Sequence, residues 1–252
     1  MEPWRTALVD SDATHIWVRG HDITTLMRQA TFVDVIYLLH RGHRPTTAER
    51  ELLDALLIAS ADHGAGAPSC ATARLAASGN RQALSAAVAA GLLAIGDEHG
   101  GAGANLMVLI GESAARAKAE GVSLEAIAGQ VVEESQASGR RLPGYGHRKH
   151  TVDPRVAVLF AMARERNLAG DGVAFVEALE GAIRARVTPL PANIDAALAA
   201  LLYDLGFPPP AGKFIFMIAR VAGLTAEVAE ELAREKPMRI RIPVVYDGEP
   251  HD

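Results

Sequence analysis

Apolar side chains recur at helical spacing along most of the chain, and this periodicity limits the fold more than any other feature of the sequence. Alanine, which favours helices and disfavours strands, fills 47 of the 252 positions. The pattern predicts a mainly α fold with a small β element at one or both ends, the first within residues 4–18 as a hairpin or extended arm. Helices are expected over residues 22–29, 31–42, 46–57, 67–78, 81–95, 101–119, 123–137, 154–167, 172–186, 192–205, 211–222 and 225–235.

Charge and cysteine content exclude several classes of protein. A formal net charge of −5 offers no broad positive surface for nucleic acid. The single cysteine excludes a disulfide framework and a cysteine-based zinc site, and it is typical of a reducing compartment. No signal-peptide pattern is present at the N-terminus, and the most apolar stretch, residues 86–95, is too short to cross a bilayer. We therefore expect a cytoplasmic protein that binds neither nucleic acid nor a membrane.

Three histidines lie in glycine-rich segments: His63 in ADHGAGAPS, His99 in GDEHGGA and His147 in PGYGHRKH. At His99 one helix is expected to end and the next to begin, which places the ring beside backbone N–H donors. The positive end of a helix disfavours a protonated ring, so a neutral imidazole there can donate a hydrogen bond to an oxyanion. Taken singly, His63 and His99 also fit structural residues that are hydrogen-bonded at helix ends.

Four charged residues are also candidates for a functional site because of where they lie in the sequence. Asp195 is in the first turn of an otherwise apolar helix, and Arg155 follows an aspartate suited to an N-cap and a proline suited to the first helical position. Arg220 ends the segment FIFMIAR, and Arg241 lies in the strand-like run RIRIPVVY. Singly, Asp195 fits a helix-dipole role and each arginine a surface ion pair. Their combination with the histidines indicates a functional site, and arginine forks suit carboxylate or phosphate.

Other chemical motifs are incomplete. HGGA at residues 99–102 resembles the oxyanion turn of some α/β-hydrolases, but no G-x-S-x-G follows, and neither a dinucleotide-binding fingerprint nor a P-loop is present. His40 with His43, and His147 with His150, have metal-ligand spacing but no third ligand at a sensible distance in the sequence. A metal-dependent hydrolase is therefore the weakest alternative, and no metal site is expected.

A series of short motifs, in the same order and spread over nearly the whole chain, resembles the motifs of the citrate synthase superfamily. The matching segments are WVRGHDI at 17–23, ADH at 61–63, EHGGA at 98–102, PGYGH at 143–147 with DPR at 153–155, NID at 193–195, ARVAG at 219–223, and Arg241 with Tyr246 and Gly248. This order is specific for the superfamily but not for one reaction within it. The resemblance implies a multi-helical bundle with a large, dimer-forming domain of residues 1–110 and 190–252 and a small helical domain of residues 111–189.

Two departures distinguish the chain from an ordinary citrate synthase. It is shorter between residues 57 and 62, and Ala-Ala-Leu-Ala at 196–199 replaces the Tyr-Ser-Gly that follows the family's NVDF. These features, with DHG and GLLAIGD, resemble citryl-CoA lyase and the C-terminal citrate-synthase-like module of ATP-citrate lyase. The resemblance therefore favours a lyase.

The resemblance implies catalytic roles for Asp195, His99 and His147. A thioester α-proton is too weakly acidic for a carboxylate in water, so such a site must desolvate the base and stabilise the enolate. Asp195 would be that base, His99 would hydrogen-bond the thioester oxygen, and His147 would exchange a proton with the keto oxygen of oxaloacetate. In the cleavage direction, His147 deprotonates the citryl hydroxyl and Asp195 protonates the enol.

The resemblance also assigns substrate carboxylates to His63, Arg155 and Arg220, joined by Arg241 from the second subunit of a homodimer or higher homo-oligomer. The expected partners are acetyl-CoA or citryl-CoA and oxaloacetate or citrate, with the CoA thioester as co-substrate and no permanently bound cofactor. CoA contacts are placed only loosely, around residues 139–149. Citryl-CoA lyase is the favoured activity. Citrate synthase or a 2-methylcitrate-type synthase is the alternative, and a non-catalytic homologue that binds CoA esters or dicarboxylates is the second.

Overall fold

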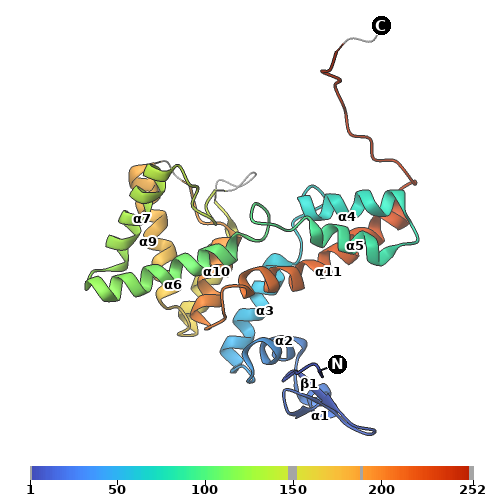
Figure 1. Ribbon diagram of the computed structural model, residues 1–252, viewed down its shortest axis with the longest axis horizontal. Helices are drawn as coiled ribbons and strands as arrows, with labels where there is room; N and C mark the ends of the chain where they lie inside the picture. Colours follow the sequence, from blue (N-terminus) through green and yellow to red (C-terminus); the bar gives the residue numbers. More distant parts are fainter. Residues whose placement is uncertain (1, 147–151, 188–189, 250–252) are drawn as a thin grey trace.

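The structure, a computed structural model, describes residues 2–146, 152–187 and 190–249. Helices make up most of these ranges, and a small sheet lies at the N-terminal end (Figure 1). The strands are β1 Val9–Ser11, β2 Ile16–Val18 and β3 His21–Asp22. The helices are α1 Ile23–Gln29, α2 Phe32–Arg41, α3 Thr47–Ala61, α4 Pro68–Gly79, α5 Leu84–Leu93, α6 Ala102–Glu120, α7 Leu124–Ser138, α8 Pro154–Glu165, α9 Asp171–Arg186, α10 Ile194–Asp204 and α11 Ala211–Arg234. The mainly α prediction is confirmed.

The N-terminal β element is an antiparallel sheet in the order β1-β2-β3. Asp10 pairs with Trp17 across the first hairpin, and Trp17 pairs with Asp22 across the second. The expected hairpin is therefore correct and gains a third short strand. The late strand-like run gives a different result, because residues 236–249 contain no strand in the described chain.

Side-chain caps fix where several helices begin. Thr46 and Glu49 form the expected capping box at the start of α3. Asp153 caps α8, with Pro154 in its first turn, as the Asp-Pro-Arg sequence predicts. Asn193 caps α10 by accepting hydrogen bonds from backbone N–H groups of its first turn. Two of these caps, Asp153 and Asn193, lie beside residues predicted to be functional.

The sequence predicts two helices, 211–222 and 225–235, where the structure has the single helix α11. The expected break falls beside Gly223, because glycine weakens a helix. In the structure Gly223 is buried, and a Cβ at this position would overlap the carbonyl oxygen of Ala61 at the end of α3. The glycine therefore serves a close helix–helix approach and does not end a helix.

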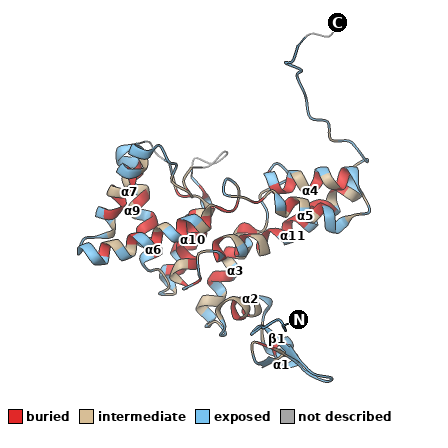
Figure 2. Ribbon diagram, viewed as in Figure 1, coloured by how far each residue is buried: buried red, intermediate tan, exposed pale blue. Residues whose placement is uncertain are grey.

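Two apolar cores meet along α11. The larger core surrounds α10, whose residues 196–202 are all 0% exposed, and α6, α8 and α9 pack against this helix (Figure 2). The smaller core joins α4 and α5 to the second half of α11. Alanine supplies much of both cores, which lets the helices pack closely. Among the helices in the described ranges, none is long and apolar enough to cross a membrane.

Beyond α11 the chain extends away from the helices as a tail (Figure 1). Residues 241–249 of this tail are exposed (Figure 2). Several are large and apolar, including Val244, Val245 and Tyr246. Burial of such side chains is favourable, so this segment is suited to contact with another surface.

Candidate active site

His99 lies in a tight turn immediately before α6. The turn is closed by Gly96 N–H donating to the His99 carbonyl at 3.0 Å and His99 N–H donating to the Gly96 carbonyl at 2.9 Å. Nε2 of His99 lies 2.9 Å from Oγ of Ser69 and accepts the backbone N–H of Ser69 at 3.2 Å. Because a backbone N–H can only donate, Nε2 is the acceptor in this contact, which fits the tautomer that carries its N–H at Nδ1.

The helix end that contacts the ring belongs to α4, since Ser69 is its second residue. The sequence suggested the start of α6 for this role. The N–H groups of a first helical turn have no partner within their own helix, so they are available to a side chain such as imidazole. The positive end of α4 also disfavours protonation of His99. The helix start that contacts His99 is therefore that of α4, and the neutral state of the ring stays a prediction.

Phe216 on α11 fixes the position of the histidine turn. Gly100 has φ +72°, and a Cβ at this position would overlap the Phe216 ring, so only glycine permits this approach. The rings of His99 and Phe216 meet edge to face with centroids 6.2 Å apart. On its other side the Phe216 ring lies 4.8 Å from Cζ of Arg220, a cation–π contact.

Arg220 is almost fully buried, with 2% of its surface exposed. Its Nη1 donates to Ser69 Oγ at 3.1 Å, so Ser69 contacts both Arg220 and His99. Its Nε donates to the carbonyl of Ser60 at 3.1 Å. A buried cation requires such partners, and here they hold it beside the histidine.

Arg155 is attached to the same helix end as Arg220. Its Nη1 donates to the carbonyl of Ala59 at 2.8 Å, next to the Ser60 carbonyl that Arg220 uses. Both carbonyls belong to the last turn of α3, where carbonyls have no helical donor and the helix dipole is negative. The end of α3 therefore brings two guanidinium groups together despite their mutual repulsion.

Asp153 holds Arg155 from the other side. Its two carboxylate oxygens accept Nε at 2.9 Å and Nη2 at 2.7 Å of Arg155, in a two-pronged pair. Asp153 is 1% exposed and also accepts the backbone N–H of Ile194 at 3.1 Å. This last bond connects Arg155 to the first turn of α10, which carries Asp195.

Asn193 connects the start of α10 to the loop that precedes His147. Its Oδ1 accepts the N–H of Asp195 at 2.9 Å, and its Nδ2 donates to the carbonyl of Gly146 at 2.8 Å. Its own N–H donates to the carbonyl of Gly144 at 2.9 Å. These bonds hold the described end of the PGYGH segment against the aspartate's helix.

Asp195 is a desolvated carboxyl group whose pKa responds to the charges of both arginines. Although the residue keeps part of its surface accessible, the surrounding protein raises the pKa of its carboxyl from 3.8 to about 6. The charges of Arg155 and Arg220 oppose this rise in pKa, and the charge of Asp153 adds to it. Such a pKa lets Asp195 gain or lose a proton near neutral pH, which suits a general acid–base group.

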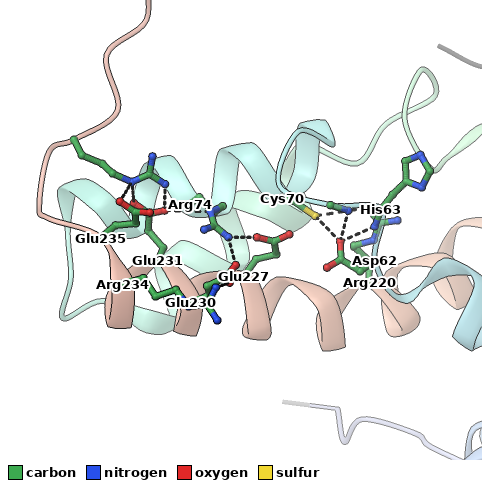
Figure 3. A network of polar contacts seen from close by, with 12 residues as sticks. Asp62, His63, Cys70, Arg74, Arg220, Glu227, Glu230, Glu231, Arg234 and Glu235 are labelled. Carbon is green, nitrogen blue, oxygen red and sulfur yellow. Dashed lines mark hydrogen bonds and ion pairs between the residues drawn. The ribbon is translucent and has the colours of Figure 1, made fainter. Parts of the chain in front are cut away.

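His63 follows Asp62 in the loop after α3, and both lie at the same end of α4 as Cys70 and Arg220 (Figure 3). Oδ1 of Asp62 accepts the N–H groups of His63 at 2.5 Å and Gly64 at 2.9 Å. It also accepts the thiol of Cys70 at 3.4 Å. These contacts fix the loop and hold His63 at the edge of the site.

Of the seven predicted site residues, the structure brings together five: His63, His99, Arg155, Asp195 and Arg220. His147 lies outside the described residues. Arg241 is exposed on the tail and does not belong to this group in one chain.

The comparisons with known proteins identify the family. The family model for the C-terminal domain of citrate synthase matches residues 42–241, which is most of the chain. The chain belongs to the citrate synthase family. The motifs quoted between residues 61 and 223 lie inside the matched range, and the chain belongs to a family of enzymes.

Within this family the chain is similar to both lyases and synthases. It is 35% identical to the citryl-CoA lyase of Hydrogenobacter thermophilus. The two structures match over 100% of this chain and 97% of that one, with a TM-score of 0.89. The ATP citrate lyase of Methanosaeta concilii, solved with (3S)-citryl-CoA, shares the fold with a TM-score of 0.75 over 98% of this chain and 43% of that one, at 21% identity. Citrate synthase of Haloferax volcanii is 29% identical over 218 residues, 85% of this chain and 54% of the relative. The chain spans about half the length of the curated relatives it matches.

Three further residues of this candidate site were not predicted as functional. Ser69 bridges His99 and Arg220, Phe216 packs between the same two residues, and Asn193 holds the loop before His147. Phe216 had a sequence signal, because it lies four residues before Arg220 and thus on the same face of α11. Ser69 had none, since its role depends on the approach of two segments far apart in the chain.

Proposed function

We propose that this chain is a citryl-CoA lyase, which cleaves citryl-CoA to acetyl-CoA and oxaloacetate. The observation that carries the proposal is the similarity to a citryl-CoA lyase over essentially the full length of both chains. The grouping of Asp195, His99 and two arginines supports it, because this chemistry needs a desolvated acid–base group, an oxyanion donor and cations for carboxylates. We also propose that the chain has two domains. The large domain consists of residues 1–110 and 190–252, and the small domain of residues 111–189.

In the proposed cleavage, His147 removes the proton of the citryl hydroxyl. As the ketone of oxaloacetate forms, the bond to the acetyl methylene carbon breaks, and its electron pair becomes the enolate of acetyl-CoA. Asp195, in its protonated form, then gives its proton to the methylene carbon and yields the methyl group. A pKa of about 6 keeps part of the Asp195 population protonated near neutral pH.

His99 would stabilise the enolate through its Nδ1–H. Its Nε2 accepts the Ser69 N–H, a contact that fits the neutral ring with its N–H at Nδ1. A neutral donor of this kind can hydrogen-bond the thioester oxygen without competing for the proton of Asp195. Fixing the ring in advance reduces the reorganisation needed when charge develops.

Arg155, Arg220 and His63 would bind the carboxylates of the citryl group. A guanidinium has five N–H donors, and the contacts to α3, Asp153 and Ser69 use only part of each set. The remaining donors suit carboxylate oxygens, which arginine binds in a two-pronged geometry. Burial strengthens this attraction, because little water competes for the charges.

Arg241 would complete the carboxylate site of a second copy in a homodimer. Its exposed position on a tail that leads away from its own site supports this arrangement. The apolar side chains of the same tail would then be covered by the partner copy. We place CoA contacts around residues 139–149 and the protein in the cytoplasm, with no permanently bound cofactor.

The test is product analysis with two substrate mixtures. Purified protein incubated with citryl-CoA should yield acetyl-CoA and oxaloacetate without citrate. Formation of free CoA and citrate from acetyl-CoA and oxaloacetate would instead identify a synthase. If neither mixture yields any product, both activities are contradicted, and a homologue that only binds CoA esters or dicarboxylates is favoured.

Citrate synthase is the second candidate, including the 2-methylcitrate type. The curated relatives named citrate synthase favour it. Both reactions use the same carbon–carbon step, and a synthase must also hydrolyse the citryl-CoA thioester. The two-mixture assay separates them because only the synthase releases free CoA.

A further inference from the structure

The tail leaves the body at a fixed point beside the end of α4. The N–H of Met238 donates to the carbonyl of Ser78 at 3.1 Å, and Met238 has φ 57°, a left-handed conformation that is unusual outside glycine. Ser78 lies nine residues along α4 from Ser69, which corresponds to about 14 Å in a helix. The root of the tail is therefore held at the end of α4 that is far from the site.

The next residue, Arg239, binds a buried carboxylate on α11. Its Nε lies 3.0 Å from Oε1 of Glu231, and its Nη2 lies 2.5 Å from Oε2. Glu231 is 0% exposed, and its Oε2 also accepts Nε of Arg74 at 3.1 Å. Glu235 adds a contact 2.9 Å from Nε of Arg239. Figure 3 shows Arg74, Glu231 and Glu235 side by side where α4 packs on α11.

Joining α4 to α11 does not require Arg239. Arg74 on α4 already pairs with Glu227, Glu230 and Glu231 on α11. What Arg239 adds is a two-pronged attachment between Glu231 and the backbone of the tail, two residues before Arg241. A fully buried carboxylate makes a strong attachment point, because losing a partner leaves part of its charge unpaired.

We propose that Arg239 is a positioning residue for the proposed reaction. By holding the root of the tail on Glu231, it aims Arg241 at the carboxylate site of a second copy of this chain. This inference rests on the proposed function. Without the attachment, the tail samples more conformations, and Arg241 must lose that freedom each time substrate binds. The effect therefore falls on substrate binding and leaves the proton-transfer groups unchanged.

Steady-state cleavage of citryl-CoA tests the proposal. Arg239→Gln should raise KM for citryl-CoA about threefold to tenfold, the factor expected when one long side chain must be ordered on binding, and keep kcat at saturation. Arg239→Lys keeps the charge but loses the planar guanidinium that makes the two-pronged contact. Its KM should therefore lie between those of the unmodified protein and Arg239→Gln. Lys236→Gln removes one positive charge from the same exposed segment and should change neither parameter.

A double-mutant cycle separates positioning from a merely structural role. Arg241→Ala should raise KM, and adding Arg239→Gln to that variant should raise it no further, because nothing is left to position. If Arg239 had only a structural role, Arg239→Gln would raise KM by the same factor in the unmodified protein and in Arg241→Ala. That result overturns the proposal, as does an unchanged KM in Arg239→Gln when Arg241→Ala raises it.

A second measurement is independent of activity. Arg239→Gln should accelerate amide hydrogen exchange at Met238, whose N–H is bonded to Ser78, and leave exchange within α10 unchanged. If the unmodified protein does not turn over citryl-CoA, the proposed function fails, whereas the attachment is still tested by exchange. Unchanged exchange at Met238 would overturn the attachment itself.

Discussion

Replacing Asp195 with asparagine should make the protein more stable while it removes the proposed acid–base group. Burial raises the pKa of this carboxyl from 3.8 to about 6, so the folded protein favours its protonated form. Above pH 6 the ionised carboxylate is held in an environment that disfavours its charge. Asparagine has nearly the same shape and carries no charge, so the variant does not have this cost.

The magnitude follows from the pKa shift. A shift of about two units, at about 1.4 kcal/mol per unit, corresponds to roughly 3 kcal/mol. Because the folded-state pKa is the higher one, the unmodified protein loses stability as pH rises from 3.8 to about 6, and the full loss is present above about 7. The free energy of unfolding of the Asp195→Asn variant should therefore exceed that of the original protein by up to about 3 kcal/mol at pH 8 and by little at pH 4.

Urea unfolding at a series of pH values measures this difference. The gap between the two proteins should open between pH 4 and about pH 7 and then stay constant. Asp54→Asn, on the exposed surface of α3, is the matched control and should show no such gap. If Asp195→Asn is equally stable or less stable at pH 8, or if its advantage is the same at every pH, the assigned desolvation of Asp195 is wrong.

Four further outcomes are expected. Asp195→Asn should abolish deuterium exchange into the methyl group of acetyl-CoA and leave oxaloacetate binding nearly unchanged, as measured by mass spectrometry and calorimetry. Ser69→Ala should lower kcat about tenfold to a hundredfold, because it removes the bridge that orients His99 and Arg220; a full rate would contradict that role. Gly223→Ala should lower the free energy of unfolding by about 2 kcal/mol, since its Cβ overlaps the Ala61 carbonyl, and unchanged stability would argue against this close approach. At a citryl-CoA concentration where Arg220→Ala and Arg241→Ala are each slow, mixing the two proteins should raise the cleavage rate above that of either alone, and no gain after verified subunit exchange would count against a site built from two chains.

Local sequence patterns predicted most of the helices and the caps that begin them. The Thr46–Glu49 capping box and the Asp153 N-cap require only residues close in sequence, so their signals are complete in the chain itself. The break expected near Gly223 was wrong because the reason for that glycine lies on another helix. Propensity alone does not distinguish a glycine that ends a helix from one that admits a neighbouring carbonyl.

The sequence names candidate site residues but not the contacts between them. A helix N-terminus beside His99 was expected from the nearest helix start, whereas the contacting N–H belongs to Ser69, thirty residues away in sequence. The attachment of both arginines to consecutive carbonyls of α3 likewise requires three distant segments to meet. Sequence spacing identifies reactive side chains, and only the packing of α3, α4, α10 and α11 determines which atoms they share.

The contact between Gly144 and Ala196 limits how large a residue the start of α10 can carry. A Cβ on Gly144 would lie 3.0 Å from the Cβ of Ala196, so the loop before His147 rests directly on the small side chains at the start of α10. A bulky residue at 196 would push that loop outward. A larger residue at 196 should therefore be tolerated only together with a change in the loop, so that helix and loop are altered as a pair.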